Sequence, residues 1–185
     1  MQCGRQVRAY LPILSTVLLL LLPGPNLSWA QTVSEHQVKA AYLYNFSKFV
    51  EWPAQAFASP TTPIRLCVLN DQAFESELNP IVKGKIVGGR AIAVIPVQNA
   101  EQARRCQILF IDSSQDKQSR QIIDALRDTS VLTVGESAGF VEKGGIINFV
   151  LQDDRVQLQV NRKAATQAGL HISSRLLSVA QRVIQ

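Results

Sequence analysis

Residues 108–134 read ILFIDSSQDKQSRQIIDALRDTSVLTV, and this stretch decides the fold of the chain. Ile108–Ile111 is a short apolar run, and Val131–Val134 is apolar except for Thr133; such runs are typical of strands buried on both faces of a sheet. Between them, the polar start at Ser113 leads into a segment with apolar residues at helical spacing. These residues are Ile122, Ile123 and Leu126. A strand, a helix and a second strand in this order predict two parallel strands joined by a crossover helix.

The same alternation continues towards the N-terminus. Ile64–Leu69 and Ala91–Val97 are apolar runs of strand length, so we expect two more strands there. Asp71 follows the first of them and is a suitable N-cap for the helix between them. The apolar face of that helix consists of Phe74, Leu78 and Ile81. Four strands with helical connections favour a parallel sheet that is covered on both faces.

A helix is expected in front of the first strand. Ser34 and Gln37 have the spacing of a capping box, which marks its start. Pro53 restricts the residue before it and ends the helix. Its apolar stripe is predicted to contain Val38, Tyr42, Phe46, Phe49 and Val50.

The last forty residues have a different pattern. Ile146–Leu151 and Val156–Val160 flank the polar residues 152–155, which predicts an antiparallel hairpin. We expect a final helix whose core stripe contains Ile172, Leu176, Leu177, Ala180, Val183 and Ile184. The sequence therefore predicts a three-layer α/β domain over residues 31–185, with a mixed, mostly parallel sheet, helices on both faces and an antiparallel C-terminal hairpin.

The first thirty residues have the layout of a cleaved secretory signal peptide. Two arginines and no acidic residue precede Leu11–Leu22, an apolar run of about a dozen residues. An uncleaved membrane anchor would need about 20 apolar residues. Small residues at Ser28 and Ala30 suit cleavage near Ala30. We expect a signal peptide at residues 1–30 and a mature, periplasmic protein beginning at Gln31.

Two cysteines, Cys67 and Cys106, would remain after this cleavage. An even pair in an exported chain predicts a disulfide. Closing a loop of about 40 residues would stabilise the fold by roughly 4 kcal/mol in the chain-entropy account. The chain has no C-x-x-C spacing, and its two histidines lie too far from the cysteines in sequence for a zinc site. We expect no metal and no cofactor.

The charge of the chain is too diffuse for a nucleic-acid-binding protein. The formal net charge is +5, and two of the 19 basic residues lie in the expected signal peptide. No Lys/Arg cluster of the kind that binds phosphate backbones is present. The nearest approach to one is Arg104-Arg105, which we interpret as a solvated helix end.

Residues 135–139 read GESAG and fit the G-x-S-x-G pattern of serine hydrolases. An aspartate and then His171 follow Ser137 in the chain order of those enzymes, which makes a secreted hydrolase an alternative. A nucleophile elbow opens a helix, however, and Gly144-Gly145 interrupts this segment. A glycine-dependent turn after a strand explains the pattern without catalysis. We expect no catalytic residue.

The positions of two aspartates resemble those of a phosphate-accepting receiver domain, but one acidic residue that such a domain needs is missing. Asp112 ends one predicted strand and Asp71 follows another. A receiver needs an acidic pair at the first strand end to hold magnesium, and only Asp71 stands there. Helix capping is the simpler role for both residues.

A small-ligand site is a second possible use of the same fold. His171 and Arg175 are one helical turn apart and could bind an anionic group with a pH-dependent affinity. Ligands of open α/β sheets collect beyond the carboxyl ends of the strands, where Glu136 and Ser137 are expected. We therefore take these four residues as candidates for ligand binding.

Several stretches resemble the YfiR family, and they occur in the family's order. They are residues 40–53 (AAYLYNFSKFVEWP), 64–69 (IRLCVL), 134–137 with 144–149 (VGES and GGIINF), 160–161, 164–165 and 168–177 (AGLHISSRLL). Together they extend over nearly all of residues 31–185. Cys67 and Cys106 match the positions of one of the family's cysteine pairs.

This resemblance implies a non-enzymatic periplasmic α/β protein that forms homodimers. Studied members of the family repress a membrane diguanylate cyclase by binding its periplasmic domain. An outer-membrane lipoprotein can capture the repressor, and cyclic-di-GMP and biofilm formation then rise. The resemblance also implies that the GESAG segment is a structural turn.

A regulator of this kind needs an exposed patch for its partner. Tyr44 lies away from the predicted apolar stripe of the first helix, and Lys48 follows one turn later. Aromatic residues dominate binding hot spots, so this pair is a candidate for partner binding. The alternative is that Tyr44 packs under a neighbouring loop.

Overall fold

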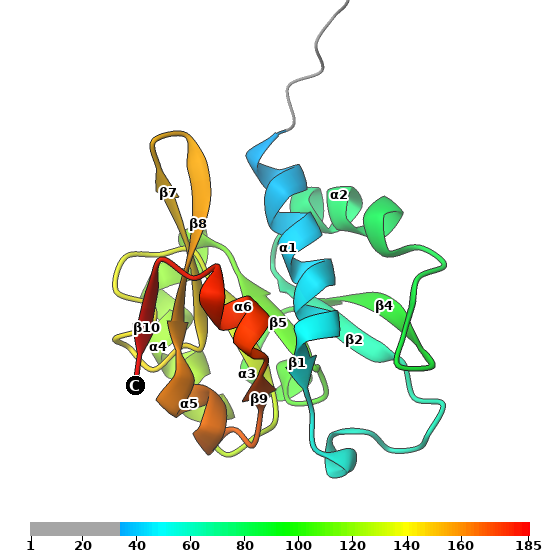
Figure 1. Cartoon of the computed structure of the whole chain (residues 1–185). Helices are drawn as coiled ribbons and strands as arrows, with labels where there is room; N and C mark the ends of the chain where they lie inside the picture. Colours follow the sequence, from blue (N-terminus) through cyan, green and yellow to red (C-terminus); the bar gives the residue numbers. More distant parts are fainter. Residues whose placement is uncertain (1–33) are drawn as a thin grey trace, which may run out of the picture. The chain divides into compact units, whose positions relative to one another are not determined.

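A computed structural model describes residues 34–185, so the expected signal peptide lies outside the described residues. The strands are β1 (Val50–Glu51), β2 (Ile64–Leu69), β3 (Ile86–Val87), β4 (Arg90–Val97), β5 (Ile108–Ile111), β6 (Leu132–Gly135), β7 (Ile147–Gln152), β8 (Arg155–Asn161), β9 (His171–Ile172) and β10 (Arg182–Ile184). The α-helices are α1 (Glu35–Phe49), α2 (Gln72–Val82), α3 (Ala100–Ala103), α4 (Asp116–Leu126), α5 (Arg162–Gln167) and α6 (Ser174–Ser178). Two 3-10 turns, η1 (Ala54–Ala56) and η2 (Ser113–Gln115), complete the set (Figure 1).

Eight of these strands form one mixed, mostly parallel sheet with the order β10-β8-β7-β6-β5-β2-β4-β3. β4, β2, β5, β6 and β7 are parallel neighbours, and β10 is parallel to β8. β7 and β8 form the predicted antiparallel hairpin, and β3 is antiparallel to β4. β1 and β9 form a separate antiparallel pair. The predicted fold class is therefore confirmed.

Helices cover both faces of the sheet, which gives three layers (Figure 1). The alternation of side chains along β2 shows the two interfaces. Leu66 and Val68 belong to the core under α1 and α2, whereas Cys67 and Leu69 belong to the core under α3 and α4. A strand with buried apolar residues on both of its faces suits a sheet with a helical layer on each side.

The helix α1 begins as predicted, with a reciprocal capping box between Ser34 and Gln37. Its buried face matches the predicted stripe only in part, because Phe46 and Val50 are buried but Val38 is only partly buried. Ala40, Leu43 and Phe46 are fully buried, whereas the aromatic residues Tyr42, Tyr44 and Phe49 are only partly buried and pack at the edge of the core. Phe46 and two smaller side chains therefore face the sheet, and the other aromatic residues flank them.

The prediction of a long C-terminal helix is wrong. The helix α6 has five residues, from Ser174 to Ser178, and strands precede and follow it. Ser173 caps its start, and residues 182–184 pair in parallel with β8 instead of continuing the helix. The apolar residues of the predicted stripe are thus divided between β9, α6 and β10. Edge pairing with β8 outweighs the helical periodicity, which five residues alone cannot sustain.

Candidate functional site

The first turns of α1 lie over the loops that follow β5 and β6. Lys39 is 6% exposed, and its Nζ lies 2.5 Å from Oε2 of Glu136, the residue after β6. Glu35 forms a second ion pair with the same ammonium group. Oε1 of Glu136 accepts a hydrogen bond from the backbone N–H of Ser113 at 3.2 Å. This network ties the N-terminal half of α1 to the carboxyl end of the sheet.

The electrostatics of this network favour a structural role for Lys39. Burial by itself would lower the pKa of Lys39, but the hydrogen bonds and charges of Glu136 and Glu35 outweigh it and raise the pKa above its ordinary value of 10.5. The lysine therefore stays protonated at neutral pH. A permanently charged, doubly paired ammonium is a poor nucleophile and a poor base. Sequence analysis missed this residue, although a lysine on the buried side of α1 is the kind of signal that could have revealed it.

The GESAG segment forms a packed turn. Ser137 is 8% exposed, and its backbone carbonyl accepts a hydrogen bond from Nδ2 of the buried Asn148 at 3.1 Å. Gly135 lies against the fully buried ring of Phe140, where a Cβ atom would come within 2.3 Å of a ring carbon. Gly139 has a φ of +71°, a value that glycine adopts without strain. Packing and backbone conformation thus account for both glycines of the motif.

A carboxylate and an amine hold the next part of this loop. Lys143 Nζ lies 2.5 Å from Oδ1 of Asp116, the first residue of α4. Lys143 and, after it, the Ser137 hydroxyl group stabilise the charged carboxylate and lower the pKa of Asp116 below its ordinary value of 3.8. The Ser137 side chain therefore lies beside the Asp116 carboxylate, which forms an ion pair with Lys143. His171 lies in β9, in another part of the fold.

The four predicted ligand-binding residues do not come together. Glu136 and Ser137 follow β6, beside the first turns of α1. His171 lies in β9, opposite Glu51 of β1, which follows the last turn of α1. Lys39 lies ten residues before Phe49, the last residue of α1, which corresponds to roughly 15 Å along the helix axis. The histidine ring approaches Glu51 at 3.7 Å, and the guanidinium group of Arg175 lies 5.8 Å from the ring centroid of Phe49.

The two residues predicted to bind a partner are neighbours on α1. Lys48 Nζ lies 4.2 Å from the centroid of the Tyr44 ring, in a cation–π contact. Lys48 is exposed, and Tyr44 is half-buried and packs against the core. Part of the tyrosine packs inward, as the alternative interpretation expects, and part stays accessible. Their role in partner binding stays a prediction.

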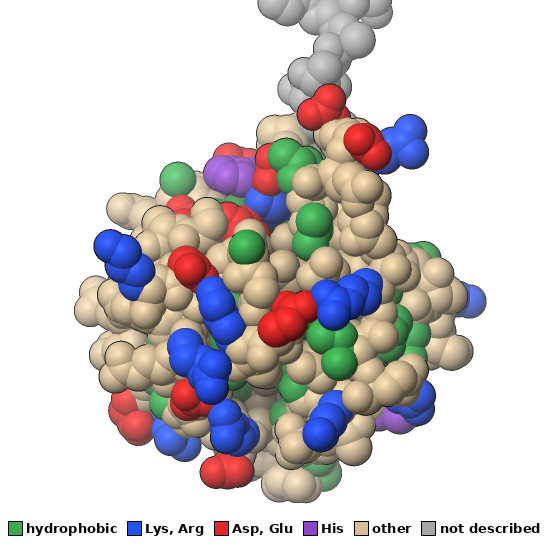
Figure 2. Space-filling model, turned by 90° about the vertical axis from the view of Figure 1, so that its left-hand side faces the viewer, with side chains coloured by type: hydrophobic (Ala, Val, Ile, Leu, Met, Phe, Trp, Pro, Cys, Tyr) green, Lys and Arg blue, Asp and Glu red, His purple; other side chains and the backbone are tan. Residues whose placement is uncertain are grey.

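A groove that sequence analysis missed lies between α1 and the β7–β8 hairpin. It has a volume of about 510 Å³ and is lined by Glu35, Val38, Tyr42, Leu151, Asp154, Arg155 and Val156. Leu151 is 56% exposed, because the hairpin extends past the point where β6 and β10 pair with it. Figure 2 views the molecule from the side on which β10 and α4 lie in Figure 1, and the charged side chains there are interspersed with isolated hydrophobic ones.

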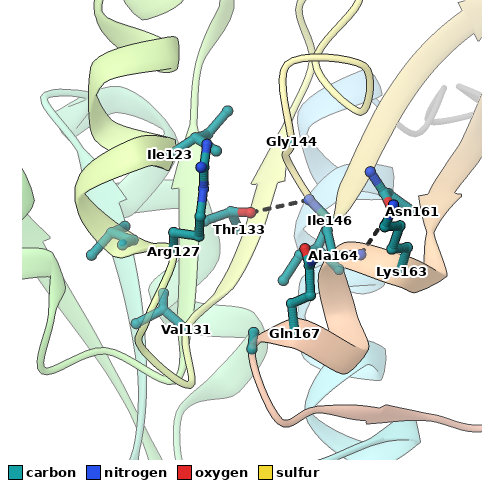
Figure 3. A pocket seen from close by; sticks show the side chains of 12 residues that line it. Ile123, Arg127, Val131, Thr133, Gly144, Ile146, Asn161, Lys163, Ala164 and Gln167 are labelled. Carbon is teal, nitrogen blue, oxygen red and sulfur yellow. Dashed lines mark hydrogen bonds between the residues drawn. The ribbon is translucent and has the colours of Figure 1, made fainter.

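A smaller cavity of about 180 Å³ lies between α4 and α5 (Figure 3). Its apolar lining includes Ile123 and Ile146, and Arg127 and Lys163 are basic residues on opposite sides of it. Thr133 Oγ1 accepts a hydrogen bond from the backbone N–H of Ile146 at 3.1 Å, so the hydroxyl group is already used. Within residues 34–185, no group of histidine, cysteine, aspartate and glutamate side chains could hold a metal ion.

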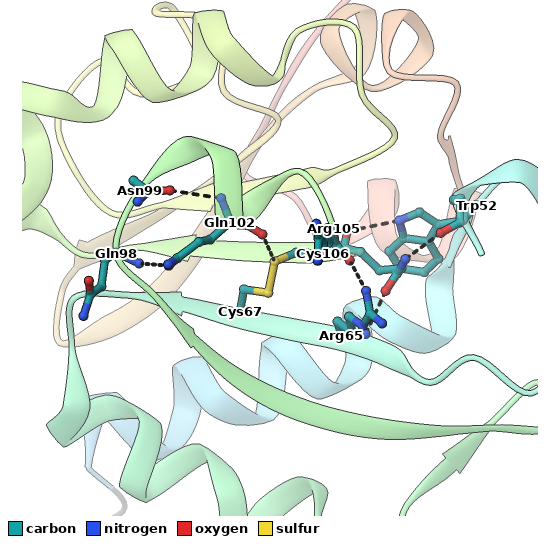
Figure 4. Close-up of a disulfide and its surroundings, with 10 residues drawn as sticks. Trp52, Arg65, Cys67, Gln98, Asn99, Gln102, Arg105 and Cys106 are labelled. Atoms are coloured by element: carbon teal, nitrogen blue, oxygen red, sulfur yellow. Dashed lines mark hydrogen bonds between the residues drawn. A yellow bond between two sulfur atoms is a disulfide. The ribbon is translucent and has the colours of Figure 1, made fainter. Parts of the chain in front are cut away.

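The predicted disulfide is confirmed (Figure 4). Cys67 of β2 is bonded to Cys106, which precedes β5, across a Cα–Cα distance of 6.0 Å. Both residues are buried in the core under α3 and α4. The bond therefore joins β2 to the segment that leads into the adjacent strand β5, on the face of the sheet that α3 and α4 cover.

A family model described as YfiR/HmsC-like matches residues 36–181. The chain belongs to this family. The resemblance to the YfiR family that the sequence indicates is thereby confirmed. No curated protein matches the chain significantly.

Two solved structures resemble this YfiR/HmsC-like chain at low sequence identity. The first is a conserved domain protein from Vibrio cholerae O1 biovar El Tor strain N16961, with a TM-score of 0.50, 12% identity and coverage of 65% of this chain and 54% of that one. The second is described as an ABC domain in complex with L-Trp from Streptococcus pneumoniae, with a TM-score of 0.46, 12% identity and coverage of 65% and 55%. The chain spans about half the length of both. The first likeness concerns the fold alone, and the second is too weak to support an argument.

Within residues 34–185, no helix is both long enough and apolar enough to cross a membrane.

Proposed function

We propose that the mature chain is a periplasmic, non-enzymatic regulator that binds the periplasmic domain of a membrane diguanylate cyclase and represses cyclic-di-GMP synthesis. Membership of the YfiR/HmsC-like family is the observation that carries this proposal, because the family model matches residues 36–181. The family suggests a periplasmic regulator of cyclic-di-GMP signalling. An outer-membrane lipoprotein that captures the regulator, and a homodimeric state, belong to the same proposal.

Two features support action in the periplasm. The first thirty residues have the pattern of a cleaved signal peptide. The disulfide between Cys67 and Cys106 suits an oxidising compartment, where such bonds persist. Neither cysteine is accessible enough for a catalytic thiol, since both are at most 4% exposed.

The geometry around Ser137 supports a role without catalysis. A serine nucleophile of the Ser-His-Asp type, which the order of Ser137 and His171 suggests, needs the histidine within hydrogen-bonding reach. His171 instead pairs with Glu51, and the other histidine, His36, pairs with Glu77 at 3.2 Å and packs edge-on against Phe74. The Ser137 backbone and the adjacent glycines serve packing, as described above.

The groove between α1 and the β7–β8 hairpin is the first candidate for the partner-binding surface. Leu151 is exposed beside the half-buried ring of Tyr42, and charged residues surround both. An apolar centre with a polar rim is the usual composition of a reversible interface. The Tyr44–Lys48 pair lies on the same helix and is the second candidate.

Direct binding tests the proposal. The mature protein is titrated against the purified periplasmic domain of a membrane diguanylate cyclase encoded beside its gene, and cyclase activity is measured in membranes. We expect saturable binding and reduced cyclic-di-GMP synthesis. Leu151→Glu should weaken binding about tenfold or more if the groove is a hot spot, and Tyr44→Ala tests the second surface. Val179→Glu, another exposed apolar residue, is the matched control. Absence of binding at tens of micromolar would contradict the proposal.

A second candidate function is a periplasmic sensor of a small ligand. The cavity between α4 and α5 favours it, because an apolar lining with Arg127 and Lys163 at its sides suits a small amphipathic anion. Calorimetric titration with nucleotides, amino acids and vitamins tests this function. Binding of one of them without any change in affinity for the cyclase domain would support the sensor over the regulator.

A further inference from the structure

Two adjoining grooves lie on the disulfide side of the molecule, one at the amino ends of β2 and β5 and one beside the carboxyl end of β4. Their volumes are about 320 and 520 Å³, and both are lined by Arg65, Arg105 and Cys106. One extends towards η1, and the other extends towards β4. Because the two grooves share these lining residues, we describe them together as one depression, with the two arginines between its two parts.

This depression has a pronounced positive charge. Arg65, Arg104 and Arg105 are its basic lining residues, and Glu101 is its acidic one. Within residues 34–185, Arg65 and Arg105 form no ion pair, and Arg104 pairs with Glu101 at 3.5 Å. The Glu101 side chain is 86% exposed, so solvent screens it strongly. We call Arg65, Arg104 and Arg105 the arginine surface.

The framework under the arginine surface is rigid. Nη1 of Arg65 donates a hydrogen bond to the backbone carbonyl of Arg105 at 3.3 Å (Figure 4). The backbone N–H of Arg65 donates to Oε1 of Gln107 at 2.8 Å. The disulfide fixes the segments that carry these residues. Among the described residues Arg65 and Arg105 have no ion-pair partner, and an anionic ligand would supply the missing counter-charge.

Apolar side chains continue the depression on the β4 side. Ile95, 37% exposed, and Pro96 line the larger groove beside the arginines. A free inorganic anion would leave this apolar strip uncovered. A polypeptide segment with carboxylates and an apolar side chain would cover both parts.

We propose that the arginine surface binds an acidic segment of a protein partner. Carboxylates of the segment pair with the guanidinium groups, whose planar donors suit bidentate contacts, and an apolar side chain of the segment lies on Ile95 and Pro96. Arginine is enriched in protein interfaces, in line with this use. The inference goes beyond the proposed function, because it holds whether or not a cyclase is the partner.

A labelled peptide tests the inference. The probe is a fluorescein-labelled decapeptide of alternating Glu and Leu, and the matched probe has Gln in place of every Glu. We expect saturable anisotropy with the acidic peptide only, and weaker binding as the salt concentration rises. The double variant Arg104→Glu/Arg105→Glu should weaken binding at least about tenfold. Lys117→Glu/Arg162→Glu makes the same charge change at two exposed residues elsewhere and should keep more than about half of the affinity.

Folding of each variant is checked by thermal unfolding, and Arg104→Gln/Arg105→Gln provides a milder substitution that should weaken binding in the same direction. Equal loss in the two Glu double variants would overturn the inference, since it would show a net-charge effect. Absence of binding at about 1 mM peptide would also overturn it. The inference would likewise be overturned if the peptide failed to bind and phosphatidylglycerol vesicles captured the wild type but not the arginine variant, because the surface would then bind lipid and not a protein segment.

Discussion

At the scale of single residues, Phe140 explains why the chain contains two of its glycines. Its ring is fully buried, and Cβ atoms added at Gly135 and Gly145 would approach the ring to 2.3 and 2.1 Å. The ring therefore packs directly against the backbone at two glycines, where any side chain would occupy the same space. The serine-hydrolase pattern at residues 135–139 arises from this packing and from the positive φ of Gly139.

Gly135→Ala should destabilise the protein by about 1–3 kcal/mol, because the new methyl group collides with the Phe140 ring in a packed core. Gly139→Ala is the matched control, since no atom lies within 4 Å of its added Cβ and only the φ of +71° is unfavourable; that cost is about 1 kcal/mol. Urea unfolding of both variants measures the difference. In a double-mutant cycle, Phe140→Leu should relieve part of the Gly135→Ala loss. Absence of any coupling between Gly135→Ala and Phe140→Leu in this cycle would contradict the steric explanation.

The pair of Lys39 and Glu136 predicts a pH dependence at the alkaline end. The pKa of Lys39 is raised in the folded protein, so its contribution to stability is fully present below the ordinary pKa of 10.5 and is lost as the pH rises through the folded-state pKa. We expect the stability difference between the wild type and Lys39→Met to be constant from pH 6 to about 9 and to shrink above about 10.5. Chemical unfolding of both proteins at several pH values measures it. A difference that changes near neutral pH would contradict this assignment.

Removal of the Glu136 carboxylate alone should destabilise the fold more than removal of both charges of the Lys39–Glu136 ion pair. Glu136→Gln leaves the buried ammonium of Lys39 with Glu35 alone, and we expect a loss of about 3 kcal/mol in the free energy of unfolding. Lys39→Met/Glu136→Gln removes the buried charge together with its partner and should be less destabilised than Glu136→Gln. The two unfolding midpoints decide between these outcomes. If the double variant were the less stable one, the ion pair itself would be the main contributor.

At the scale of elements, local sequence patterns predicted the central strands and failed at the edges of the sheet. Ile108–Ile111 coincides with β5, and Ile64–Leu69, which is apolar except for Arg65, coincides with β2, because apolar runs of that length have few alternatives. β3, with two residues, and β10, with three, were not foreseen. Their pairing with β4 and β8 is set by tertiary contacts.

The candidate sites follow the same rule. The pairing of Cys67 with Cys106 could be predicted, since two cysteines allow one bond. The groove beside Leu151 could not, because its exposure depends on how far the hairpin extends past its neighbouring strands. Arg65 was visible in the sequence as a charge within an apolar strand, but its position next to Arg105 depends on the parallel pairing of β2 with β5.

The disulfide predicts how strongly two elements depend on each other. It joins β2 to the segment before β5 across a sequence separation of 39 residues. Cys67→Ala/Cys106→Ala should lower the free energy of unfolding by about 3–4 kcal/mol through the larger entropy of the unfolded chain. Reduction of the wild type should produce a similar loss, whereas reduction of the double variant should change nothing. A stable double variant with an unchanged denaturation midpoint would refute a stabilising role.

At the scale of the whole molecule, three cysteines make the export history of the chain measurable. Cys3 lies in the expected signal peptide, and Cys67 and Cys106 lie in the fold. Export, cleavage near Ala30 and oxidation together predict a periplasmic protein with no free thiol under denaturing conditions and two after reduction. If the signal peptide were retained, Cys3 would add a third thiol after reduction. If the disulfide had not formed, free thiols would be detected without reduction. Titration with a chromogenic thiol reagent distinguishes these states, and N-terminal sequencing locates the cleavage site independently. Free thiols in protein taken directly from the periplasm would mean that the disulfide is not the resident state, and would remove one of the two supports for action in that compartment.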